Sequence, residues 1–123
     1  MLSGKHAVIT GGSKGIGLAI GELFADHGAE VTLVARSADD LDGAVERLRE
    51  RGATADAIQL DICDKAAVEE MVKRLGADFR CDVLVNNAGP ILQGAPVLGS
   101  EDRKWLETFD TKVMGAVRLS RAL

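Results

Sequence analysis

Short apolar runs alternate with amphipathic helical patterns along this chain, and this alternation constrains the fold more than any other feature. The expected strands are residues 7–10, 30–35, 57–60 and 83–85. Strands separated by helices form right-handed βαβ units, so the sheet is expected to be parallel. The sequence therefore predicts a doubly wound α/β fold of three layers, with strand order 3-2-1-4 and helices on both faces of the sheet.

The segments between these strands carry helix start and stop signals. Gly28 and Gly52 follow the first and second helices, where a C′ glycine belongs. Ser37 and Asp64 are expected to cap the second and third helices. The expected apolar faces of the three helices are Ile16, Ala19, Ile20, Leu23 and Phe24, then Leu41, Ala44, Val45 and Leu48, then Val68, Met71, Val72 and Leu75.

The last third of the chain is expected to hold a loop and one helix. Residues 89–99 contain both prolines and three glycines, which is typical of an irregular loop. Ser100 is expected to begin the helix, with Glu101 and Asp102 in its first turn. Its apolar residues are Trp105, Phe109, Val113, Ala116 and Val117. The sequence stops at Leu123 without a capping signal, so we expect one domain, residues 1–123, truncated after the fourth strand and the following helix.

Composition narrows the function classes. A net charge of -4 and only four aromatic residues among Phe, Trp and Tyr argue against a nucleic-acid partner. No apolar run approaches the roughly 20 residues that span a bilayer, and no signal peptide precedes the first strand, so neither a membrane nor a secretory route is expected. Cys63 and Cys81 lack metal-ligand spacing and fit ordinary reduced thiols. We therefore expect a cytoplasmic protein without a metal site.

A glycine-rich segment, residues 10–17, joins the first strand to the first helix. Gly11 permits a tight turn, Gly15 lets a pyrophosphate approach the backbone, and Gly17 allows close helix–strand packing. The free N–H groups at the helix start offer an anion site that the helix dipole strengthens. The spacing differs from G-x-G-x-x-G, and a βα turn that merely needs glycines is the alternative. Doubly wound folds bind ligands at this edge of the sheet, where residues 86–89 also fall.

The residues after the second strand predict which nicotinamide cofactor is preferred. Folds that prefer NAD usually place a carboxylate there to hold the ribose hydroxyls. This chain has Arg36 and Ser37 instead, and a guanidinium pairs with the 2′-phosphate of NADP. Lys14, inside the glycine loop, is expected to approach the same phosphate. The sequence therefore predicts NADP rather than NAD, against the alternative that both cations are simply solvated.

Two glycine motifs at two strand ends resemble those of the short-chain dehydrogenase/reductase family. The cofactor loop is Thr10-Gly-x-x-x-Gly-x-Gly17, and Asn86-Asn-Ala-Gly89 follows the fourth strand. Asp61-Ile62, at the end of the third strand, is similar to the pair that holds adenine in that family. The resemblance covers the whole chain and implies a Rossmann-type dinucleotide fold.

The resemblance also implies roles for individual residues. Asp61 would accept the adenine amino group while the backbone of Ile62 reads the ring, and residues 86–89 would brace the sheet and line the adenosine ribose. Together with the loop and the two cations, the expected cofactor-binding residues are Gly11, Ser13, Lys14, Gly15, Ile16, Gly17, Arg36, Ser37, Asp61, Ile62, Asn87, Ala88 and Gly89.

The chain departs from the family in two places. Aligned on Trp105 and Gly115, the position that usually holds an Asn of the proton relay is Lys112, and a charged Lys cannot accept a hydrogen bond. Lys112 is therefore either an active-site donor or a snorkelling helix residue. The family's catalytic Tyr-x-x-x-Lys motif is absent, since the chain contains no tyrosine.

The expected function is NADP(H)-dependent hydride transfer between a carbonyl and an alcohol, with a small molecule as substrate. Without the tyrosine, these 123 residues alone are expected to be inactive. The alternative is a non-catalytic nucleotide-binding module. A methyltransferase-like domain is disfavoured, because it would place an acid where Arg36 stands. Relatives in the family imply a homo-oligomer formed partly through the helix that contains Trp105 and Leu119.

Overall fold

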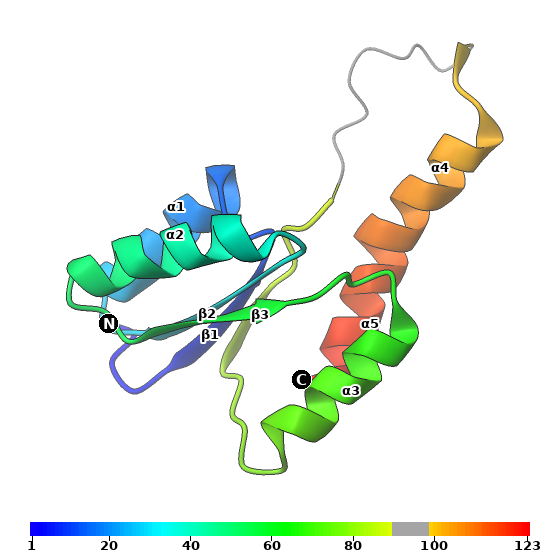
Figure 1. The fold of residues 1–123 in the computed structure, drawn as a ribbon. Helices are drawn as coiled ribbons and strands as arrows, with labels where there is room; N and C mark the ends of the chain where they lie inside the picture. Colours follow the sequence, from blue (N-terminus) through cyan, green and yellow to red (C-terminus); the bar gives the residue numbers. More distant parts are fainter. Residues whose placement is uncertain (90–98) are drawn as a thin grey trace.

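The computed structural model describes residues 1–89 and 99–123, which form a parallel α/β sandwich (Figure 1). The elements in chain order are β1 (His6–Thr10), α1 (Gly15–Asp26), β2 (Glu30–Ala35), α2 (Ala38–Glu50), β3 (Ala55–Gln59), α3 (Lys65–Leu75), β4 (Val83–Val85), α4 (Asp102–Phe109), η2 (Asp110–Met114) and α5 (Gly115–Ala122). The sheet order is β3-β2-β1-β4 and the three strand pairs are parallel. The expected fold class and strand order are confirmed.

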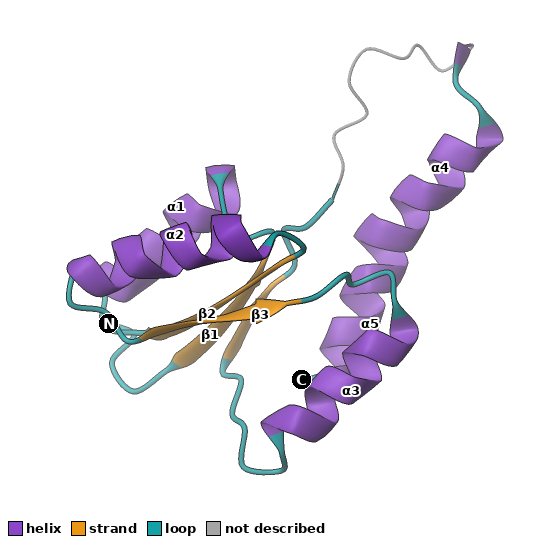
Figure 2. Ribbon diagram, viewed as in Figure 1, coloured by secondary structure: helices purple, strands orange, loops and turns teal. Residues whose placement is uncertain are grey.

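Helices cover both faces of the sheet (Figure 2), so the three-layer arrangement is also confirmed. One core cluster lies between the sheet and the α1–α2 layer and includes Ile9, Leu33 and Leu48. The second lies between the sheet and the α3–α5 layer and includes Val8 and Leu119. Adjacent residues of β1 thus point into opposite clusters, which is why a central parallel strand is apolar along its whole length.

The predicted signals at the ends of α1, α2 and α3 are confirmed. The Ser37 hydroxyl accepts the Asp40 N–H at 3.3 Å, and the Asp64 carboxylate accepts the Ala67 N–H at 3.0 Å. Gly28 and Gly52 have φ values of +86° and +84°, the left-handed conformation that suits a residue just past a helix. These local interactions fix where the helices begin and end, and therefore how long each loop is.

The apolar face predicted for α1 is confirmed only in part, since Ile20 and Phe24 pack against the first core cluster. Ile16 and Leu23 are 73% and 55% exposed, and the two buried residues of the helix are Gly17 and Gly21. A Cβ added at Gly21 would lie 3.2 Å from the Leu33 side chain, so the glycines let α1 lie close against the sheet. Because α1 is apolar around most of its circumference, hydrophobic spacing alone did not separate the residues that face the sheet from Ile16 and Leu23, which face away.

Two further expectations need correction, and a third cannot be compared with the described residues. The third strand was predicted over residues 57–60, and β3 instead spans Ala55–Gln59. Ser100 does not cap the last helix: Glu101 is its N-cap residue, and the Ser100 hydroxyl accepts the Trp105 indole N–H at 2.6 Å. The predicted loop over residues 89–99 lies mostly outside the described residues, which resume at residue 99.

The last helix also differs in its packing. It contains one π-helical turn, η2, between α4 and α5, which the sequence did not predict. Trp105, Phe109 and Val113 from its expected apolar set are exposed, and Leu119 contacts the core instead. Only α5 therefore packs firmly on the sheet, while α4 extends beyond its edge (Figure 1).

At the amino end of the sheet, Asp82 joins β1 to the segment before β4. Its carboxylate accepts the His6 backbone N–H at 2.9 Å, the Arg80 guanidinium at 2.8 Å and the Lys5 ammonium at 3.4 Å. The His6 N–H and then Arg80 lower the pKa of Asp82 to about 2. The charged form therefore contributes to stability at neutral pH.

Two absences concern only the part of the chain that the structure describes. None of its helices has the length and apolar character to cross a bilayer. Within residues 1–89 and 99–123, no three His, Cys, Asp or Glu side chains gather in a way suited to a metal ion. Cys63 and Cys81 are both free thiols.

We expect Leu48→Ala to destabilise the protein by about 2–5 kcal/mol, since Leu48 is fully buried and the cavity would not collapse completely. Leu23→Ala removes the same atoms from the exposed side of α1 and should cost far less. The free energy of unfolding in urea measures both. Equal losses would contradict the orientation of α1 described above.

Asp82→Asn should lower stability at pH 7, and the difference from the unmodified protein should shrink on acidification. The pKa of Asp82 in the folded state is about 2, below the unfolded value near 3.9. Its contribution is thus complete above about pH 4 and is lost as the pH falls toward about 2. Urea unfolding at several pH values checks this, and a difference that does not change with pH would refute it.

Candidate cofactor-binding site

The Thr10 hydroxyl, at the carboxyl end of β1, joins the glycine loop to the segment after β4. It accepts the backbone N–H groups of Asn87 and Ala88, both at 2.9 Å, and donates to the Val85 carbonyl at 3.3 Å. Thr10 is only 1% exposed, so these bonds form away from water. The two loops are therefore held as one unit.

The Asn87 side chain adds a second connection between the same loops. Its amide nitrogen lies 3.2 Å from the Thr10 carbonyl and 3.3 Å from the Gly11 carbonyl. Strand β4 pairs directly with β1, which places both loops at one edge of the sheet. The sequence predicted this proximity, because the carboxyl ends of parallel neighbours meet at the same edge.

Glycine is required at two of these positions because backbones meet there. A Cβ at Gly17 would overlap the Gly11 carbonyl oxygen and would lie 2.7 Å from the Asn87 amide nitrogen. Gly11 has φ +63°, and a Cβ there would lie 2.9 Å from the same nitrogen. These two glycines therefore let α1, the loop and Asn87 pack closely.

Gly15 has a different environment, since no atom lies within 4 Å of the place its Cβ would occupy. Its φ is +58°, and it is the first residue of α1. Lys14 is the N-cap residue and makes no side-chain capping bond. Open space beside an uncapped helix start suits a phosphate group, which would accept the first-turn N–H groups near Ser13, Gly15 and Ile16.

Two cations belong to the loops that follow β1 and β2. Arg36 is exposed, and its guanidinium forms no ion pair with any described residue, while its carbonyl accepts the Gln59 amide at 3.0 Å. The Lys14 ammonium lies 3.9 Å from an Asp40 carboxylate oxygen. Asp40 is in turn bonded through its N–H to Ser37, next to Arg36. These contacts link the start of α1 to the turn that carries Arg36.

The end of β3 forms a third part of the edge. The Asp61 carboxylate accepts the Cys63 backbone N–H at 2.9 Å, which fixes the turn that follows the strand. Ile62 is buried in the second core cluster, and its carbonyl accepts the Arg118 guanidinium at 3.2 Å. Asp61 thus sits at the surface while its neighbour is anchored.

Contacts from the last helix hold this turn. A Cβ at Gly115 would lie 2.6 Å from the Ile62 side chain, so only glycine allows the helix this close. The Cys63 thiol lies 3.2 Å from the Thr111 hydroxyl, and partial burial raises the pKa of the thiol. The Arg118 guanidinium also bonds Asp110 at 2.7 Å and lowers the pKa of that carboxyl.

Lys112 lies in the π-helical turn η2 beside Gly89. A Cβ at Gly89 would lie 2.8 Å from Cγ and 2.9 Å from Cε of Lys112, so the lysine stem runs along the glycine backbone. π-Helical turns occur often at functional sites. The structure therefore places Lys112 at the same edge as Asn87 and Ala88, although that contact alone assigns it no role.

Most of the residues predicted for the site lie along one edge of the sheet, at the ends of β1, β2, β3 and β4. Sequence reasoning missed the residues that hold these parts together: Thr10, Asp110, Thr111, Gly115 and Arg118. The position of Thr10, at the end of a buried strand before a glycine, was a usable signal. The others act from the π-helical turn and the start of α5, whose register the sequence did not reveal.

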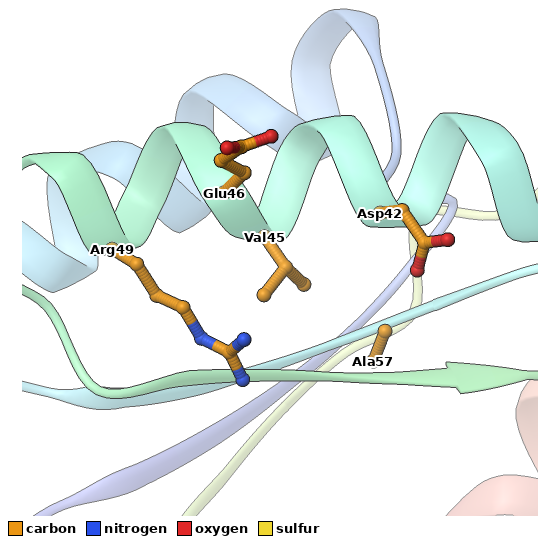
Figure 3. Close-up of a pocket in the computed structure, with 5 residues that line it drawn as sticks. All are labelled: Asp42, Val45, Glu46, Arg49 and Ala57. Atoms are coloured by element: carbon orange, nitrogen blue, oxygen red, sulfur yellow. The ribbon is translucent and has the colours of Figure 1, made fainter.

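A groove elsewhere on the molecule lies between α2 and β3, lined by Asp42, Val45, Glu46, Arg49 and Ala57 (Figure 3). Arg49 crosses it, bonding the Ala55 carbonyl and the Asp56 carboxylate, each at 2.9 Å. None of the residues predicted to bind cofactor lines this groove. It is an exposed surface feature between a helix and the edge strand.

The parallel sheet of order 3-2-1-4, with a glycine loop leading into an uncapped helix, is a doubly wound domain of the Rossmann type. A family model described as short chain dehydrogenase matches residues 5–123. The chain belongs to this family, whose members are NAD(P)-dependent oxidoreductases.

Known proteins agree with this assignment. The 3-oxoacyl-[acyl-carrier-protein] reductase FabG of Escherichia coli (strain K12) is 35% identical over 121 residues, which cover 98% of this chain and 48% of the relative. The crystal structure of L-sorbose reductase from Gluconobacter frateurii, complexed with NADPH and L-sorbose, is 42% identical with a TM-score of 0.88. The match covers 99% of this chain and 47% of the sorbose reductase chain.

A metagenomic short-chain oxidoreductase in complex with NADP is 34% identical, also with a TM-score of 0.88. This chain is covered over 99% and that protein over 56%. The chain therefore spans about half the length of the relatives it matches.

Thr10→Val leaves the backbone N–H groups of Asn87 and Ala88 without their acceptor. We predict that each unpaired group lowers the free energy of unfolding by about 1–3 kcal/mol. Valine has nearly the same shape, so packing should change little. Thr10→Ser keeps the hydroxyl and should retain most of the stability. The unfolding free energies of the three proteins check this, and a Val variant as stable as the Ser variant would contradict the role given to the hydroxyl.

Proposed function

We propose that this chain forms the NADP(H)-binding part of a short-chain oxidoreductase that interconverts a carbonyl and an alcohol. The observation that carries the proposal is the pair of cations, Lys14 and Arg36, at the ends of β1 and β2, with no carboxylate directly after β2. A guanidinium and an ammonium stabilise a 2′-phosphate, which NAD lacks. The relatives whose crystal structures hold NADPH or NADP support this choice.

The described geometry fits the rest of the cofactor. The open space at Gly15 and the uncapped start of α1 would hold the pyrophosphate, with backbone N–H groups from Ser13, Gly15 and Ile16 as donors. Gly11 permits the turn that aims these groups outward, because its left-handed φ is open to glycine.

The adenosine would lie between the ends of β1, β2 and β3. Asp61 would accept its amino group, and the backbone of Ile62, fixed by Arg118, would read the ring edge. Ser37 would contact the phosphorylated ribose. Asn87, Ala88 and Gly89 would line this same adenosine ribose, since Thr10 holds the backbone of that segment.

When bound, NADP(H) supplies or accepts the hydride. This chain's contribution is to bind and orient the cofactor. The chain has no tyrosine, so we propose that these 123 residues alone do not catalyse the reaction and that a proton donor of the family's type lies in further sequence. A non-catalytic nucleotide-binding module remains the second reading, supported by the same absence. The whole protein's substrate belongs to the class of small carbonyl or alcohol compounds.

Two further assignments are part of the proposal. Lys112 contacts Gly89 at the cofactor edge, and its ammonium is either a donor at the active site or a solvated group on a packed stem. The exposed apolar residues Trp105, Leu106, Phe109 and Val113 support pairing of two copies through α4 and η2.

Calorimetric titration of the full-length gene product with NADPH and with NADH tests the cofactor assignment. The proposal predicts tighter binding of NADPH. Equal affinities, or tighter NADH, would refute the preference, and binding of neither would refute the cofactor role. The intact mass of the purified product, compared with the 13.0 kDa of this sequence, decides whether catalysis or binding alone should then be assayed.

Arg36→Asp should weaken NADPH binding by roughly tenfold or more and leave NADH binding equal or stronger. The change replaces a cation by an anion beside the 2′-phosphate, and a carboxylate at this place holds ribose hydroxyls in NAD-binding folds. Arg74→Asp, on the exposed part of α3, changes the net charge equally. If both variants weaken NADPH to the same extent, Arg36 has no specific role.

A further inference from the structure

One contact at the proposed phosphate site opposes its function. The Lys14 ammonium, assigned above to the 2′-phosphate, already has a carboxylate of Asp40 at 3.9 Å. The two residues belong to the starts of different helices. Lys14 is the N-cap residue of α1, and Asp40 lies in the first turn of α2. The Asp40 carboxylate therefore competes with the 2′-phosphate for the Lys14 ammonium.

The backbone of Asp40 is held at the start of α2. Its backbone N–H donates to the Ser37 hydroxyl at 3.3 Å, so the residue is held where α2 begins. Ser37 directly follows Arg36, so this bond holds the Asp40 backbone close to the turn that carries Arg36. The start of a helix also favours a negative side chain electrostatically.

The pair has two opposite effects on a bound 2′-phosphate. Asp40 restrains Lys14, which reduces the entropy lost when the phosphate binds. It also repels the phosphate, which carries close to two negative charges at neutral pH. The Lys14 side chain is 83% exposed and that of Asp40 is 49% exposed, so the restraint is weak, whereas the repulsion acts on a doubly charged group. The repulsion is therefore the larger effect.

We infer that Asp40 is a specificity-determining residue that weakens the binding of NADP and leaves that of NAD largely unaffected. The inference rests on the proposed function, because it needs the 2′-phosphate to lie at Lys14. Lys14 and Arg36 strengthen the binding of NADP relative to NAD, and Asp40 makes this difference in affinity smaller. Removing the charge of Asp40 should increase the preference.

Asp40→Asn in the full-length gene product tests this, with Asp39→Asn as the matched control. Asp39 is the neighbouring acid in the same first turn of α2 and has no ion pair within the described residues. Both variants lose one charge near the helix start. We expect Asp40→Asn to lower the Kd for NADPH by about two- to fivefold, the range of one exposed charge interaction, and Asp39→Asn to change it less.

Two measurements separate an electrostatic effect of Asp40 on NADPH binding from a change in structure: the dependence on ionic strength and the affinity for NADH. The gain from Asp40→Asn should shrink as ionic strength rises, and the Kd for NADH should stay the same. Equal changes in both variants, or weaker NADPH binding by Asp40→Asn, would overturn the inference while leaving the proposed function intact. Failure of the unmodified protein to bind NADPH would overturn both.

Discussion

The buried hydroxyl of Thr10 joins the glycine loop after β1 to the segment after β4. It accepts two backbone N–H groups from the segment after β4 and donates to the carbonyl that ends β4. The Asn87 side-chain amide also joins the two loops, because it donates to the Thr10 and Gly11 carbonyls. In a buried place each of these groups would cost free energy if left unpaired, so the two loops are stable only together. The position of the glycine loop thus depends on β4, which lies more than 70 residues away along the chain.

Close packing makes the same connection possible. Gly17 lets α1 approach Gly11 and Asn87, and Gly115 lets the last helix approach Ile62. The helices on the two faces therefore support opposite ends of one binding edge: α1 supports the loop proposed for phosphates, and η2 with α5 supports the turn proposed for adenine. Polar contacts from Thr111 and Arg118 complete the second support. Small residues determine this geometry, because any Cβ at those two positions would separate the layers.

Much of this arrangement was predictable from sequence, for reasons that particular residues make clear. The strand order followed from the alternation of elements, and the helix boundaries followed from Ser37, Asp64, Gly28 and Gly52, whose effects are local. The stripe of α1 that faces the sheet was not predictable from hydrophobicity, because glycines fill it and Ile16 and Leu23 do not. The π-helical turn and the displaced start of α4 were also missed. Thr111 of the turn contacts Cys63, which is 48 residues away in the sequence, and the Ser100 hydroxyl accepts the Trp105 indole N–H instead of capping the helix.

The central claim is that the edge joined by Thr10 holds NADP with its 2′-phosphate between the loops after β1 and β2. A crystal structure of the full-length gene product with NADP tests it most directly. We expect the pyrophosphate against the backbone at Gly15 and the start of α1, and the 2′-phosphate within hydrogen-bond distance of both Lys14 and Arg36. A cofactor bound in another place, such as the groove between α2 and β3, or a 2′-phosphate that contacts neither cation, would contradict it.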